Sequence, residues 1–167
     1  SSDEYLAFTR EVMLEDCSSQ FKLVKFLSNF CLNNNYEFIL RVHPNTRNKS
    51  LLDIDLWNEL GEYLLEREQK FYSSKSNINT YSIIQNSDLI VTNGSTVTVE
   101  SCLEGKNVCL CGFNGLRDYE SAFIPKDLEN LKEYILSENF INKEKIIKGA
   151  KKYLLDELQA GRILKYY

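Results

Sequence analysis

A serine, a threonine and a glutamate between residues 86 and 112 have the types and spacing of an anion-binding turn. Residues 88–92 form a short apolar run typical of a buried strand. Asn93 and Gly94 then signal a turn, because both residue types tolerate positive φ. Ser95 takes the position expected of a helix N-cap, with Thr96 just inside a helix that ends at Leu103 or Glu104.

The start of that helix suits a phosphate group, since its backbone N–H groups are unpaired and the helix dipole is positive there. The hydroxyls of Ser95 and Thr96 add donors. Glu100 follows Thr96 by four residues, so its carboxylate projects from the same helix face about 5 Å further along, within reach of ribose hydroxyls. A plain structural reading stays open, in which Ser95 only caps the helix and Glu100 only faces solvent.

His43 is a second candidate, because it ends another predicted strand, residues 37–42, just before Pro44. Ligands bind at the carboxyl ends of strands in open α/β sheets. The imidazole could donate to a phosphate oxygen, and its charge would respond to that phosphate. A purely structural hydrogen-bonding role remains the alternative. Arg41 alternates with Val42 and could point either to the same edge or to solvent.

Composition excludes several classes of protein. The chain has 167 residues, of which 43% are hydrophobic and 26% charged, as expected for one globular domain. Its net charge of −4 argues against binding nucleic acid through phosphate neutralisation. With one histidine and no CxxC pair, a zinc site is not expected. Of the five cysteines, Cys102, Cys109 and Cys111 lie in elements expected to be buried, and we interpret these three as small hydrophobic residues in a reducing compartment.

Hydrophobic periodicity predicts an alternation of helices and strands. Helices are expected over residues 19–32, 52–66, 80–85, 95–104, 127–136 and 143–158, with Gly161 ending the last one; strands are expected over residues 37–42, 70–73, 88–92 and 107–111. A strand–helix–strand crossover implies parallel strands. The predicted fold class is therefore α/β, with a Rossmann-like, mostly parallel sheet flanked by helices. No apolar run reaches the length of a membrane span, and no signal peptide is expected.

A series of short motifs, in order, resembles a known family. It runs Arg-Val-His-Pro-Asn (41–45), Asn-Thr-Tyr-Ser (79–82), Ser-Asp-Leu-Ile-Val (87–91), Gly-Ser-Thr (94–96) with Glu100, and Glu-Gly-Lys-Asn-Val (104–108). The series is similar to the donor-binding, C-terminal half of GT-B glycosyltransferases, most closely the HP-motif proteins of bacterial capsule and surface-polysaccharide biosynthesis. The resemblance covers most of residues 36–120. Asn107 departs from it, since the family usually has proline there.

The resemblance assigns roles to individual residues. It implies that His43, Ser95 and Thr96 contact the donor phosphate, and that Glu100 binds the ribose. Residues 79–82, with Tyr81 and Ser82, would lie beside the base. Asn93, Gly94 and Arg41 complete the predicted donor-binding set, and no catalytic residue is assigned. No metal or other cofactor is expected, since the one Asp-x-Asp pattern, residues 53–55, falls at a helix start away from the strand ends.

The same resemblance implies that the chain, residues 1–167, is one domain of a longer protein. The first strand and the N-terminal, acceptor-binding half would be missing, and residues 1–4 would follow that strand. The expected function is transfer of a sugar from a nucleotide-activated donor to a glycan or a lipid-linked acceptor. The location would be cytoplasmic, with room for peripheral association of the full-length protein with the inner face of the membrane. The alternatives are a sugar-nucleotide epimerase of the same fold and a non-catalytic nucleotide- or phosphate-binding module.

Overall fold

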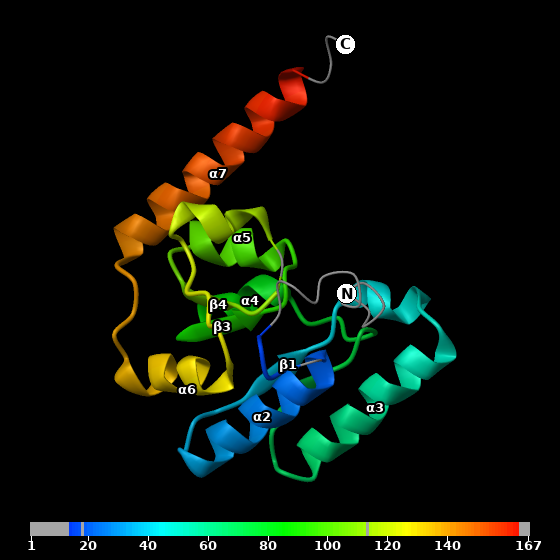
Figure 1. The fold of residues 1–167 in the computed structure, drawn as a ribbon. Helices are drawn as coiled ribbons and strands as arrows, with labels where there is room; N and C mark the ends of the chain where they lie inside the picture. The colour runs from blue at the N-terminus through cyan, green and yellow to red at the C-terminus, as the bar shows by residue number, and fades with distance from the viewer. Residues whose placement is uncertain (1–13, 18, 113, 164–167) are drawn as a thin grey trace.

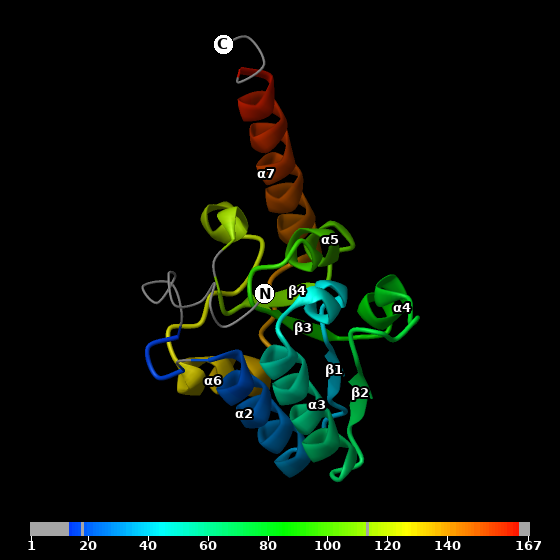
Figure 2. The ribbon, with the colours of Figure 1, turned by 90° about the vertical axis from the view of Figure 1, so that its right-hand side faces the viewer.

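A computed structural model of the chain describes residues 14–17, 19–112 and 114–163. Its strands are β1 (Ile39–Arg41), β2 (Lys70–Tyr72), β3 (Leu89–Thr92) and β4 (Asn107–Leu110). Its α-helices are α2 (Gln20–Asn33), α3 (Leu51–Leu65), α4 (Thr80–Gln85), α5 (Val97–Leu103), α6 (Leu128–Ser137) and α7 (Lys143–Ile163), and two 3₁₀ segments are η2 (Pro44–Asn48) and η3 (Gly115–Tyr119). Figures 1 and 2 show their arrangement from two sides.

The predicted α/β class and its parallel pairing are confirmed, whereas one continuous sheet is not seen in the described residues. β1 pairs with β2 and β3 pairs with β4, both in parallel, as two separate two-stranded sheets. Phe123 extends the second sheet through a parallel bridge to Cys109. At the carboxyl ends of the two strand pairs, the last backbone hydrogen bonds run from the Val42 N–H to the Tyr72 carbonyl and from the Cys111 N–H to the Thr92 carbonyl.

β4 and Cys111, the residue directly after it, organise the packing, because alternate side chains along this segment serve two different cores. Cys109 and Cys111 pack against α2 and α6, whereas Val108 and Leu110 pack against α5, η3 and α7. Figure 1 shows the resulting layers, with α5 on one side of β3 and β4 and α6 on the other. A third cluster, with Leu60 and Leu64 at its centre, joins α2 and α3 to the first sheet.

The three cysteines predicted to be buried, Cys102, Cys109 and Cys111, are all inaccessible and free. Burial raises the pKa of the Cys102 thiol to about 12, and burial also raises the pKa of Cys111 to about 12. Their thiolate forms are therefore scarce near neutral pH, which fits the interpretation of these residues as small hydrophobic side chains.

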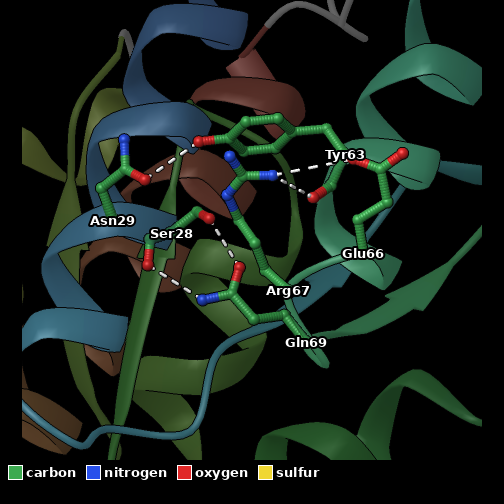
Figure 3. A network of polar contacts seen from close by, with 6 residues as sticks. All are labelled: Ser28, Asn29, Tyr63, Glu66, Arg67 and Gln69. Atoms are coloured by element: carbon green, nitrogen blue, oxygen red, sulfur yellow. Dashed lines mark hydrogen bonds and ion pairs between the residues drawn. The ribbon is translucent and has the colours of Figure 1, made fainter.

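A polar network ties α2 to the start of β2 (Figure 3). The Ser28 hydroxyl donates to Gln69 Oε1 over 2.5 Å, and Gln69 Nε2 donates back to the Ser28 carbonyl over 2.9 Å. Both residues are buried. Beside them Tyr63 donates to Asn29, and the Arg67 guanidinium lies 3.6 Å from the centre of the Tyr63 ring. The reciprocal bonds satisfy both buried groups and fix how α2 sits on the first sheet.

Helix boundaries agree with the predictions at most ends. Ser19, Asn79 and Asp127 each accept a backbone N–H as N-caps of α2, α4 and α6. The prediction for the last helix is wrong: Gly161 does not end it, and α7 continues to Ile163. A single glycine lowers helix stability by about 1 kcal/mol, which an established helix can accommodate. In the described part of the chain, no helix is long and apolar enough to cross a membrane.

Candidate functional site

The turn between β3 and α5 differs in one detail from the prediction. Ser95 is not the N-cap; Thr96 takes that position with helical φ and ψ, and its side chain makes no capping bond. The physical reason is that the Thr98 N–H, which a Ser95 cap would use, is bonded over 3.0 Å to the Ser95 carbonyl. Both hydroxyls of the Ser95–Thr96 pair are therefore without a protein partner within the described structure.

The backbone of this turn presents donors. Gly94 has a φ of +87°, a conformation that glycine adopts without steric cost. The N–H groups of Ser95, Thr96 and Val97 have no backbone acceptor among the described residues. Such groups at a helix start favour an anion, and α5, with seven residues, adds only a short dipole.

Two contacts hold the turn in place. The hydroxyls of Thr92, at the end of β3, and Thr98, in the first turn of α5, lie 2.8 Å apart and are buried. On the other side, Asn93 lies directly against Gly112: a Cβ added at Gly112 would come within 2.5 Å of Asn93 Oδ1 and 2.9 Å of the Asn93 carbonyl carbon. Glycine at position 112 is therefore required for this close approach.

Asn93 is the most unusual residue at the turn. Both its Oδ1 and its Nδ2 are shielded from solvent and have no hydrogen-bond partner in the described structure. A shielded amide without partners is unfavourable by about 1–3 kcal/mol, and most buried polar groups avoid that situation. Unpaired groups of this kind call for an explanation, and a bound ligand is one of the physical possibilities.

Glu100 lies one turn further along α5 and faces α4. The pKa of Tyr81 is raised, chiefly because the negative charge of Glu100 lies near its hydroxyl. Tyr81 itself is 51% exposed. The structure thus brings together the two residues that the resemblance assigns to the ribose and the base. The Ser82 side chain, on the next position of α4, is exposed.

α4 is held in this position by a residue of the Gly-Lys motif. Lys106 Nζ donates to the carbonyl of Gln85, the last residue of α4, over 2.7 Å and to the carbonyl of Ser87, just after the helix, over 3.0 Å. A cation at a helix C-terminus is favourable for the helix dipole as well as for the unpaired carbonyls. Lys106 is therefore a positioning residue for α4.

His43 caps η2 through its side chain. Its Nδ1 accepts the backbone N–H of Asn45 over 3.1 Å, so the neutral ring carries its proton on Nε2, which is left as a donor. The pKa of His43 is lowered from its usual value by partial burial and by the nearby Arg41 charge. The exposed ring can thus donate from Nε2 without first being protonated.

The Arg41 guanidinium is turned toward loop carbonyls. It donates to the Ser73 carbonyl over 2.9 Å, to the Ser76 carbonyl over 3.3 Å and to the carbonyl of Val42. Burial lowers its pKa from the usual value. These bonds fasten the loop after β2 to the end of β1. The donor-binding role predicted for Arg41 remains a prediction.

A cavity of about 10 Å³, room for about one water molecule, lies between η2, α3 and the strand ends of the first sheet. Its lining includes Val42, Thr46, Trp57 and Phe71, and none of the predicted donor-binding residues. This cavity is therefore separate from the predicted donor-binding residues.

Comparison with known proteins places this geometry in a biological setting. A family model described as "putative O-antigen biosynthesis protein" matches residues 14–124, more than half of the chain. The chain belongs to this family. The expectation of a role in surface-polysaccharide biosynthesis is thereby confirmed at that level. The matched range includes both candidate loops, at His43 and at Ser95. No curated protein and no solved structure matches the chain.

Several residues that build the site were not identified from the sequence. Thr92, Thr98 and Gly112 shape the turn through the threonine hydroxyl contact and the close approach of Asn93 to Gly112. The sequence features that could have indicated them are the small polar residues on either side of the turn and the glycine soon after the next strand. The role of Lys106 was also missed, because its partners lie about twenty residues away along the chain.

Proposed function

We propose that this O-antigen family chain is the donor-binding domain of a glycosyltransferase that uses a nucleotide-activated sugar. The observation that carries the proposal is the β3–α5 turn, where the shielded, unpaired Asn93 amide adjoins three backbone N–H groups and two hydroxyls without acceptors. Such a set matches the oxygens of a phosphate group, each of which accepts hydrogen bonds.

In this proposal, the turn binds the donor phosphates and Glu100 accepts hydrogen bonds from the ribose. Tyr81, whose hydroxyl lies near the Glu100 carboxylate, is placed beside the base. The Nε2–H of His43 donates to a phosphate oxygen. When the sugar leaves, these donors stabilise the negative charge that develops on the nucleotide phosphate.

We further propose that both strand pairs belong to one Rossmann-like sheet in a complete glycosyltransferase of the GT-B type. Because Phe38 and Val42 bond to β2, the backbone groups of Ile39 and Arg41 point away from it. By the same alternation, those of Leu89 and Val91 in β3 point away from β4. Each sheet thus has an edge that could pair with one further parallel strand.

Isothermal titration calorimetry with CMP, CDP, UDP and inorganic pyrophosphate tests the site. Glu100→Gln should weaken nucleotide binding by about tenfold to a hundredfold, because a hydrogen bond to a charged group contributes about 1.5–3 kcal/mol. Pyrophosphate affinity should stay unchanged, because pyrophosphate has no ribose. Glu104→Gln, at the exposed end of the same helix, is the matched control and should bind like the unaltered chain.

If no nucleotide binds to the folded chain, the proposed function is wrong. Equal losses for nucleotides and pyrophosphate would show that Glu100 does not face the ribose. Nucleotide binding without turnover fits a donor-binding domain, whereas interconversion of a sugar nucleotide by the chain would instead identify an epimerase.

A further inference from the structure

The second half of α7 projects away from the rest of the molecule. Figures 1 and 2 both show the helix leaving the body beyond α5. Its first half is packed, since Ile146 and Ala150 are fully buried in the cluster around β4. Every residue from 155 to 160 is exposed. A helix normally owes its stability to the burial of an apolar face, and residues 155–160 bury none within the described structure.

The projecting half nevertheless has an apolar face. Leu154, Leu155 and Leu158 follow Lys151 at helical spacings of three, four and seven residues, so the four share one side of the helix. Leu155 is 57% exposed and Leu158 is 62% exposed. We call these four residues the leucine face.

The acidic residues of this half lie off the leucine face. Asp156 is turned toward the body, where its Oδ2 accepts a hydrogen bond from the Tyr119 hydroxyl over 3.0 Å. Glu157 adds to the negative charge near the same tyrosine, where it helps raise the pKa of Tyr119. The leucine face therefore combines exposed apolar side chains with a lysine, and the carboxylates are directed elsewhere.

α7 is also positively charged in a negatively charged chain. The helix contains six basic and three acidic residues, giving +3, whereas the whole chain carries −4. The remaining residues therefore carry −7. Lys148, Lys151 and Lys152 are all exposed, just before the leucines. This separation of charge favours contact between α7 and a negatively charged surface and disfavours contact through the rest of the molecule.

We propose that the leucine face of α7 binds an anionic lipid surface, with the helix lying in the interface. A basic amphipathic helix with exposed leucines inserts its apolar side chains at the boundary between headgroups and acyl chains, while its lysines pair with lipid phosphates. The lysines beside the leucines have long apolar stems and can reach those phosphates. This binding does not depend on the donor site.

Cosedimentation with lipid vesicles tests the proposal. Neutral vesicles of phosphatidylcholine are compared with vesicles in which part of that lipid is replaced by anionic phosphatidylglycerol. The bound fraction should rise with the anionic fraction and fall as salt is added. The double variant Leu155→Gln/Leu158→Gln should lower the partition coefficient by about tenfold or more, since two leucines no longer leave water. Glutamine keeps the helix propensity high.

Ala160→Gln is the matched control, because residue 160 is exposed on the opposite side of α7. It should leave vesicle binding unchanged. Both variants should melt like the unaltered chain, since the altered side chains are exposed. Absence of binding to anionic vesicles, or binding that the leucine variant retains in full, overturns the proposal. Analytical ultracentrifugation that shows a dimer lost only in the leucine variant also overturns it, because the face would then bind a second copy of the chain.

Discussion

The buried hydroxyl pair of Thr92 and Thr98 offers a sharp test of how the candidate turn is stabilised. The two oxygens are 2.8 Å apart, Thr98 is fully buried and Thr92 is 7% exposed. Replacing Thr98 with valine keeps the shape and removes the hydroxyl. The Thr92 hydroxyl is then left buried without this partner.

The expected magnitude follows from that burial. Leaving a buried hydroxyl unpaired lowers the free energy of unfolding by about 1–3 kcal/mol, whereas replacing both partners with apolar groups of the same shape is nearly neutral. For a chain of this length each 1 kcal/mol corresponds to about 2–4 °C in Tm. Thr98→Val and Thr92→Val should therefore each lower Tm by about 2–12 °C, and the double variant should recover most of that loss.

Thermal melting and urea denaturation compare the unaltered chain, the two single variants and the double variant, which together form a double-mutant cycle. Nucleotide titration of the same four proteins provides the functional readout. Because the pair joins the end of β3 to α5, each single variant should also weaken nucleotide binding. Losses that simply add in the double variant would refute the reasoning, since the two hydroxyls would then not depend on each other. Full nucleotide affinity in a destabilised single variant would show that the pair does not position the turn.

Two further predictions concern the same site. Because His43 is the only histidine, NMR can follow its imidazole without assignment, and its pKa should lie below 6.5 in the free chain and rise when a nucleotide binds. Nucleotide affinity should then be constant at pH values above the pKa of the bound form and increase as the pH falls toward the pKa of the free form. A His43 pKa that does not change with nucleotide would exclude a phosphate contact. Gly112→Ala places a methyl group 2.5 Å from Asn93 Oδ1, so it should lower the free energy of unfolding by about 1–3 kcal/mol and weaken nucleotide binding in calorimetry. The control is Gly115→Ala, whose methyl group would contact the Tyr153 side chain, and this variant should bind nucleotide like the unaltered chain.

Local chemistry explains why the elements could be predicted from the sequence. Apolar runs identified all four strands, and side chains such as Ser19 and Asp127 marked helix starts through bonds that span only three residues. Pairing between strands is different, because it depends on contacts between distant segments. The sequence predicted parallel strands, yet it did not indicate that β1–β2 and β3–β4 would remain separate within the described residues.

At the candidate site, too, some local features were predicted correctly from the sequence and others were not. Gly94 was predicted from its residue type alone, because positive φ is a local property. The N-cap at Ser95 was predicted on equally local grounds and was wrong, because the backbone used the competing Thr98 donor. That competition leaves the Ser95 and Thr96 hydroxyls unpaired at the end of a strand, where a ligand can reach them. A local rule for helix capping thus failed at the turn that we propose to bind the donor phosphate, and functional sites often depart from the most stable local structure.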